Sequence, residues 1–206
     1  MRFLEEVFRD DTESVELLRE WFGYVLSGQT KLHKMVMWLG PKRGGKGTVA
    51  QLLKRLVGAD AYGVLKTSDL RDNFALESLV GKSLVVLPDE RQVGAPDGKL
   101  LVQFILQATG EDDVTVRRKY KTPLSGRLPM RVMYMANEPP VLPDSSGAVQ
   151  DRILMIETVV SFAGKDSGCL ISPFASNSSR PSSAQFNMPG SLSRKQNDKE
   201  AGRHGN

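Results

Sequence analysis

The residues whose types and spacing most directly predict chemistry run from Gly40 to Thr48 and read Gly-Pro-Lys-Arg-Gly-Gly-Lys-Gly-Thr. They match the G-x-x-x-x-G-K pattern of a loop whose backbone amides surround phosphate oxygens and whose lysine faces the β- and γ-phosphates. The residues expected to bind a nucleotide are Gly40, Gly44, Gly45, Lys46, Gly47 and Thr48. Gly47 replaces the Ser or Thr that usually follows the lysine and ligates magnesium, so the role of Thr48 as a magnesium ligand stays open.

Two adjacent carboxylates, Asp89 and Glu90, follow the apolar segment 83–87. The second half of a P-loop ATPase site needs such a pair at the end of a strand, with Asp89 in the magnesium shell and Glu90 orienting and deprotonating the attacking water. By itself the pair is an ordinary strand end. Its place about 40 residues after the glycine-rich loop makes it a candidate Walker B motif.

Two later polar residues each have two interpretations. Asn137 follows the apolar segment 131–136, where its amide either contacts the γ-phosphate or the attacking water, as a sensor, or begins the turn Asn-Glu-Pro-Pro. Arg152 opens the last predicted strand. Its guanidinium either reaches the γ-phosphate of a neighbouring subunit, as an arginine finger, or forms a surface ion pair with Asp151 or Glu157.

The stretch between Val116 and Val132 is rich in Lys and Arg and has no acidic residue. A projecting hairpin with these cations beside Tyr120 would follow a nucleic-acid backbone, with lysines on phosphates and the ring stacked on a base. The alternative is a solvated basic loop, and Arg127 and Arg131 extend the same stretch. The residues predicted to contact single-stranded DNA are Arg117, Arg118, Lys119, Tyr120 and Lys121.

The spacing of apolar residues predicts the elements that must position these groups. The expected strands are 35–39, 62–66, 83–87, 131–136 and 153–158, and the expected helices are 11–27, 46–57, 68–79 and 98–109. We expect Asp11 and Gly28 to cap the first helix at its two ends. Strands that alternate with helices in this way predict an α/β nucleotide-binding fold with a sheet of about five strands.

Composition limits the other possibilities. The single Cys169 excludes an internal disulfide framework and a cysteine metal cluster. A net charge of +4 is too small to indicate nucleic-acid binding, which must rest on local clusters. Because we find neither a long apolar run nor a signal peptide, we expect a cytoplasmic protein without membrane contact.

The sequence divides into three parts. We expect an N-terminal helical segment over 1–30, a P-loop ATPase core over 31–165 and a disordered tail over 166–206. The tail is rich in Ser, Asn, Gly and Pro, a composition that buries too little surface to offset chain entropy.

Taken in order, these motifs resemble the superfamily-three helicase module at the C-terminal side of phage and plasmid primase–helicases. The resemblance covers most of 3–165 and rests on segments 3–8, 20–28, 40–48, 80–83, 110–112, 118–120, 126–129, 137–140 and 147–152. It implies an AAA+-like, three-layer αβα domain with a mostly parallel sheet. It also implies a hexamer-like ring of identical subunits that hydrolyses ATP with magnesium (Mg2+) at its interfaces and moves along single-stranded DNA during phage or plasmid replication, with a primase or replication initiator as a possible partner.

The same resemblance assigns roles to individual residues. Lys46 and Thr48 would serve phosphate and magnesium, Asp89 and Glu90 metal and water, and Asn137 sensing. Arg152 would be the finger in trans, and Lys119 would lie on the DNA-facing hairpin.

Two departures from the family pattern lie at the ends of the chain. Family members usually carry a primase or other domain upstream, whereas Met1 lies at the edge of the helicase module. They also continue into further helices where this chain passes, after 159–162, into its Ser-rich tail, which suggests a frameshift or truncation. We therefore predict a helicase-type ATPase that needs oligomerisation. The alternatives are a non-catalytic remnant that binds nucleotide or DNA, and a small P-loop nucleotide kinase, because Gly-Lys-Gly-Thr also occurs in such kinases.

Overall fold

The computed structural model describes residues 2–88, 94–110 and 112–164, which fall within one compact unit, Met1–Lys165. The predicted acidic pair Asp89 and Glu90 and the predicted tail lie outside the described residues.

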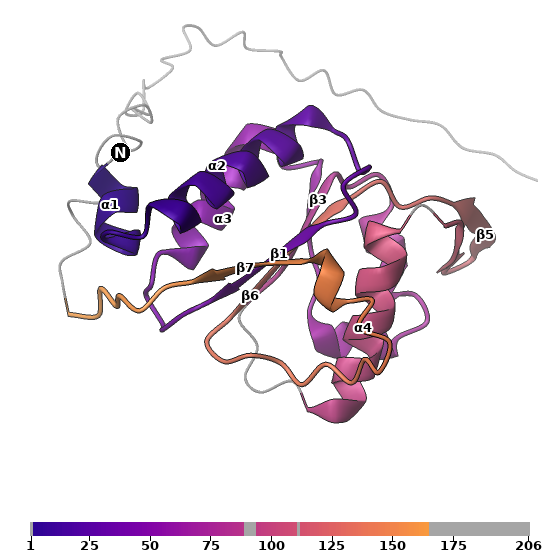
Figure 1. Ribbon diagram of the computed structural model, residues 1–206. Helices are drawn as coiled ribbons and strands as arrows, with labels where there is room; N and C mark the ends of the chain where they lie inside the picture. Colours follow the sequence, from indigo (N-terminus) through magenta and orange to yellow (C-terminus); the bar gives the residue numbers. More distant parts are fainter. Residues whose placement is uncertain (1, 89–93, 111, 165–206) are drawn as a thin grey trace, which may run out of the picture. The chain divides into compact units, whose positions relative to one another are not determined.

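In the described part of the chain, five parallel strands form the central sheet in the order β2-β3-β6-β1-β7 (Figure 1). The strands are β1 Met35–Leu39, β2 Tyr62–Val64, β3 Leu84–Leu87, β6 Arg131–Ala136 and β7 Ile153–Glu157. Because all five run the same way, their carboxyl ends lie at one edge of the sheet. This is the edge at which open α/β sheets bind ligands.

Helices cover both faces of this sheet (Figure 1). One face packs against α1 Arg2–Phe8, α2 Thr12–Ser27 and α3 Lys46–Val57. The other face packs against α4 Ala95–Thr109 and the short 3-10 helices η1 Thr67–Arg71 and η2 Ala75–Leu79. A third 3-10 helix, η3 Gln150–Arg152, comes directly before β7. The predicted three-layer αβα fold is confirmed.

The alternation of side chains along each strand produces the two cores. In β1, Met35 and Met37 belong to the cluster under α4, whereas Val36 and Trp38 belong to the cluster under α2 and α3. All of β1 is buried, as expected for a parallel strand covered on both faces. This explains why the sheet is visible in the sequence as short, continuous apolar runs.

The caps predicted for the first long helix are both confirmed. A carboxylate oxygen of Asp11 accepts a hydrogen bond from the Ser14 amide at 2.9 Å. The pKa of Asp11 is lowered by the Ser14 side chain first and by this amide second. Gly28 takes the left-handed conformation with φ 73°, which ends the helix at little steric cost.

The predicted helix over 68–79 is wrong, because the segment forms η1 and η2 instead. Between them, a side-chain oxygen of Asp72 accepts a hydrogen bond from the Phe74 amide at 2.9 Å. Asp and Asn offer the backbone such local partners in place of helical hydrogen bonds. The residues of this interruption, Asp72 and Asn73, line one wall of a pocket.

No helix in the described part of the chain is long and apolar enough to cross a membrane.

Arg131 is buried at the start of β6 and is 2% exposed. Its guanidinium donates hydrogen bonds to the carbonyls of Val25, at 2.9 Å, and Gly28, at 3.1 Å, at the carboxyl end of α2. Burial lowers the pKa of Arg131. The sequence places Arg131 in the basic stretch, but this side chain is unavailable to a nucleic acid and instead joins α2 to the sheet.

We expect Arg131→Met to destabilise the protein by about 2 to 3 kcal/mol, because hydrogen bonds from a charged donor to two carbonyls are lost in a buried place. Urea unfolding followed by circular dichroism measures the change. Lys121→Met, on an exposed position of the basic stretch, is the matched control and should leave the midpoint unchanged. Equal stability of the two variants would contradict a structural role for Arg131.

Candidate functional site

The glycine-rich loop joins the carboxyl end of β1 to the start of α3 and is held by both neighbouring strands. The Gly40 amide donates to the carbonyl of Ala136, the last residue of β6, at 3.1 Å. The Thr158 amide, after β7, donates to the carbonyl of Leu39 at 2.9 Å. A Cβ on Gly40 would lie 2.2 Å from Thr158 Oγ1 and 2.7 Å from the Thr158 carbonyl oxygen, so no other residue fits without movement. The sequence motif contains no sign of this support from Thr158.

Helix α1 also packs against the loop. Gly45 caps α3 in the left-handed conformation, with φ 88°. A Cβ there would come 3.0 Å from Val7 Cγ2 and 3.2 Å from the Phe3 ring. Both a positive φ and close packing therefore require glycine at this position.

Lys46 is the best-defined side chain of the loop. It is 6% exposed, and its Nζ donates hydrogen bonds to the Gly40 carbonyl, to the Pro41 carbonyl at 3.2 Å and to Asn137 Oδ1 at 2.9 Å. Lys46 and Asn137 are 91 positions apart in the sequence. The strands β1 and β6 are neighbours, and Leu39 lies opposite Ala136. Asn137 directly follows β6, and Lys46 follows β1 through the loop, so the two side chains meet at the same edge of the sheet.

The first turn of α3 provides donors for an anion. In the described part of the chain, the amides of Gly45 and Gly47 donate to no acceptor. Such amides, together with the positive end of the helix dipole, favour a phosphate at this position. The Thr48 side chain is exposed on the same turn, and Gly44 is buried in the loop behind it. The loop thus offers amides, a buried ammonium group and a hydroxyl to one small region.

The two carboxylates predicted to complete this site, Asp89 and Glu90, lie outside the described residues. The strand before them, β3, pairs with β6 in the sheet. Within the described ranges no group of three His, Cys, Asp or Glu side chains forms a metal site. Of the two residues predicted to ligate magnesium, only Thr48 lies among the described residues.

Arg152 lies at the other edge of the sheet. It ends η3, and the next residue, Ile153, stands opposite Met35 at the start of β1, so roughly 13 Å of strand separates it from the loop. Its Nη1 donates to Thr109 Oγ1 at 2.9 Å and to the Leu106 carbonyl at 3.2 Å, at the carboxyl end of α4. Among the described residues Arg152 makes no salt bridge, including with the two acids considered above.

A turn centred on Asp144 leads into η3. Its carboxylate accepts hydrogen bonds from the Ser146 hydroxyl at 2.5 Å, the Ser146 amide at 3.0 Å and the Val149 amide at 2.7 Å. The bond from the Ser146 hydroxyl is the largest of the causes that lower the pKa of Asp144. This turn fixes the approach to Arg152, and the sequence indicated only that a turn was present.

The basic stretch forms the expected hairpin, with β4 Val114–Arg118 and β5 Lys121–Gly126 as an antiparallel pair separate from the main sheet (Figure 1). Tyr120, at its tip, is 95% exposed and has φ 60°. Lys119 Nζ lies 5.5 Å from the centre of the Tyr120 ring. The hairpin thus presents an aromatic face and a cation side by side to solvent.

Two sets of hydrogen bonds hold the hairpin. The Lys119 amide donates to a side-chain oxygen of Glu77, on η2, at 2.9 Å. The Arg118 guanidinium turns back and donates to the Thr122 carbonyl at 3.0 and 2.8 Å. The hairpin follows α4 in the chain. The last residue of α4, Thr109, lies close to the start of β1, because its carbonyl accepts a hydrogen bond from the ring of His33 at 2.7 Å, with the ring nitrogen taken as donor. The hairpin therefore emerges near the end of the sheet that carries Arg152 and away from the glycine-rich loop.

Comparisons with known proteins find one matching family and several solved structures with a similar fold. A family model described as "Family of unknown function (DUF5906)" matches residues 38–152. An apo structure of the NrS-1 C-terminal region is similar with a TM-score of 0.65 and 19% identity, over 81% of this chain and 39% of that chain. A structure of JCV helicase with a bound acetamide compound is similar with a TM-score of 0.52 and 20% identity, over 76% of this chain and 43% of that chain. The chain thus spans less than half of each of these structures. At identities this low, the similarity shows a shared helicase-like fold and nothing more.

Proposed function

The chain belongs to the family of unknown function DUF5906, and on that premise we propose that it is the core of an ATP-dependent motor of the helicase type, which acts on single-stranded DNA. One observation carries the proposal: Lys46 Nζ and Asn137 Oδ1 meet at 2.9 Å beside the glycine-rich loop, at the carboxyl edge of a parallel sheet. A lysine and an amide that converge beside free backbone amides suit a terminal phosphate. Asn137 thereby gains support as a sensor over its alternative as a simple turn residue.

The described residues fit a nucleotide triphosphate. The amides of Gly45 and Gly47 and the ammonium group of Lys46 would hold the phosphates, in a loop whose shape the contacts of Gly40 and Thr158 maintain. Thr48 and Asp89 would hold Mg2+, which when bound neutralises charge on the β- and γ-phosphates. Glu90 would accept the proton of the attacking water, and Lys46 would leave its carbonyl partners to follow the developing negative charge.

Arg152 supports a ring. It cannot reach the loop of its own subunit, because a full strand length separates the two, so any contact with a γ-phosphate would be with that of a neighbouring subunit. This is the arrangement in which a finger acts in trans. We propose a hexamer-like homo-oligomer on this basis, which works beside a primase or replication initiator in phage or plasmid replication.

The hairpin is the proposed contact with DNA. Lys119 and Lys121 would bind phosphates, Tyr120 would stack on a base, and Arg117 and Arg118 would add positive charge just before the tip. The fold shared with a protein named JCV helicase supports this assignment.

The experiment that tests the function separates oligomeric states by size-exclusion chromatography and measures ATP hydrolysis with and without single-stranded DNA. We expect hydrolysis in the assembled fraction, faster with DNA, and little in the monomer. Phosphoryl transfer to a nucleotide acceptor would instead indicate a small kinase. Nucleotide binding without turnover in every fraction would indicate a non-catalytic remnant, and either result contradicts the motor.

We expect Lys119→Ala/Lys121→Ala to weaken single-stranded DNA binding at low salt and to reduce the slope of log affinity against log salt by about 1.4, since each lost phosphate contact removes about 0.7. Fluorescence anisotropy over a salt series gives both values. Lys54→Ala/Arg55→Ala, on α3 at the opposite face of the sheet, removes the same charge and is the matched control. An equal slope change in both variants would assign the effect to net charge and not to the hairpin.

A further inference from the structure

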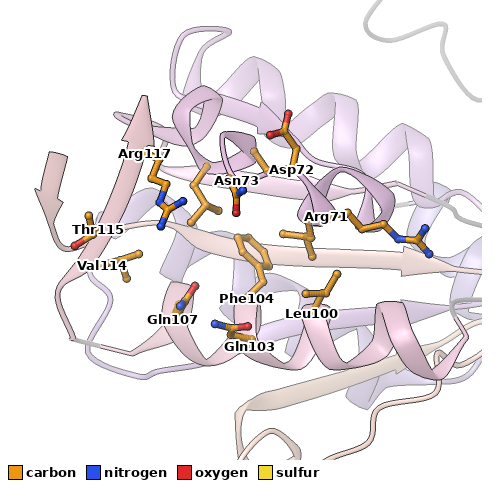
Figure 2. Close-up of a pocket in the computed structure, with 13 residues that line it drawn as sticks. Arg71, Asp72, Asn73, Leu100, Gln103, Phe104, Gln107, Val114, Thr115 and Arg117 are labelled. Carbon is orange, nitrogen blue, oxygen red and sulfur yellow. The ribbon is translucent and has the colours of Figure 1, made fainter. Parts of the chain in front are cut away.

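A pocket of about 550 Å³ lies beside the hairpin, between η1, η2, α4 and β4 (Figure 2). It is separate from the glycine-rich loop, because no residue of that loop lines it. The interruption between η1 and η2 at Asp72 and Asn73 forms one wall, and successive turns of α4 form the wall opposite. Pockets of this volume are typical of small-molecule or single-group ligands.

The pocket has an apolar floor and a polar rim. Phe104 is 2% exposed and forms the floor together with Leu100, one turn earlier on α4. Figure 2 shows the Phe104 ring at the centre of the pocket, with the side-chain amides of Gln103 and Gln107 on one side and Asn73 on the other. Apolar area surrounded by a few convergent polar groups is the usual composition of a specific binding site.

The polar groups of the rim are available for binding. In the described part of the chain, the side chains of Asn73, Gln103, Gln107 and Arg117 make no hydrogen bond or ion pair. Arg71, on the same rim, differs, because its guanidinium donates to both carboxylate oxygens of Asp97, at 2.7 and 2.9 Å. Three amides and one guanidinium therefore face the pocket without competing partners among the described residues.

The pocket is tied to the hairpin. Thr115 and Arg117 reach it from β4, five and three residues before the exposed tip at Tyr120. The hydrogen bond from the Lys119 amide to Glu77 holds the tip against η2, which itself lines the pocket. A nucleic-acid strand bound along the hairpin would therefore pass the mouth of the pocket.

We propose that the pocket receives one unstacked base of single-stranded nucleic acid whose backbone follows the hairpin. This inference rests on the proposed function. Amides donate and accept at once, as the edges of bases require, and the floor at Phe104 matches the apolar face of a base. Arg117 supplies positive charge where the adjoining phosphate must lie. The carboxylate of Asp72, also on the rim, is engaged by the Phe74 amide.

The test compares two labelled oligonucleotides of equal length by fluorescence anisotropy, one with all its bases and one with a run of abasic sites, on the assembled full chain. The wild-type protein should prefer the complete oligonucleotide by about tenfold. Gln103→Leu/Gln107→Leu should reduce that preference to the part that stacking on Tyr120 supplies, while its affinity for the abasic oligonucleotide stays within about twofold of wild type. Gln51→Leu, exposed on α3, is the matched control and should keep the preference.

A second variant guards against a change in α4 itself. Asn73→Ala, in the loop between η1 and η2, removes an amide from the opposite wall and should also reduce the preference. Pocket variants that bind DNA with an undiminished preference overturn the pocket and leave the proposed function intact. Failure of the wild-type assembly to bind either oligonucleotide overturns both proposals.

Discussion

Lys46→Ala should reduce ATP hydrolysis by about 10² to 10³-fold, the range expected when a preorganised donor to developing charge is removed. The reason lies in the position of the ammonium group. It is buried at the junction of the loop and the β6 strand end, next to Asn137, where low exposure strengthens its interaction with phosphate. The measurement is steady-state hydrolysis by the assembled protein, with single-stranded DNA present.

Lys42→Ala is the matched control for this prediction. Lys42 belongs to the same loop and carries the same charge, but its side chain is exposed, so its removal should change hydrolysis by about twofold or less. Thermal melting of both variants checks that the fold survives the loss of the Lys46 hydrogen bonds. DNA-stimulated hydrolysis that persists in Lys46→Ala would contradict the assigned nucleotide site.

Arg152→Ala should reduce hydrolysis by about 10³-fold or more, the usual effect of removing an arginine finger. The decisive measurement mixes two inactive variants. A ring assembled from Lys46→Ala and Arg152→Ala subunits contains, at about a quarter of its interfaces, an intact loop facing an intact arginine. We therefore expect the mixture to regain part of the activity that each variant lacks alone.

The mixing experiment also separates catalysis from stability. Arg152 donates to Thr109 Oγ1 and to the Leu106 carbonyl, so its removal leaves the end of α4 without a cation. Thr109→Val removes one of these partners and keeps the arginine; it should cost about 1 kcal/mol of stability and leave hydrolysis nearly unchanged. Lower stability in Arg152→Ala without recovery in the mixture would make Arg152 a structural residue alone.

Much of the fold was predictable because its signals are local. The bounds of β1, α3 and β6 agree with the prediction, since each is a continuous apolar run or a helical repeat with a clear start. The segment 68–79 was mispredicted because its apolar spacing is helical while Asp72 provides a competing local hydrogen bond. Spacing alone does not show which of these two local effects is stronger.

The candidate site was predictable only in part. The loop residues could be recognised from spacing, because glycine and lysine carry their chemistry in a continuous stretch. Arg131 was misassigned to the basic surface, because nothing in its neighbours in sequence reveals that it points at the end of α2. The pocket with Phe104 at its floor was not anticipated, since its walls come from four separate elements.

The amino-acid sequence by itself determined that this protein has a glycine-rich loop between a strand and a helix, a parallel α/β sheet and a basic hairpin. These features depend on residue types and on short spacings, so their signals lie within a few neighbouring residues of the sequence. The tertiary structure decided that Lys46 meets Asn137, that Thr158 and α1 pack against the loop, and that Arg152 lies a strand length away from it. Each of these depends on the order β2-β3-β6-β1-β7, because strand order sets which distant residues share an edge of the sheet.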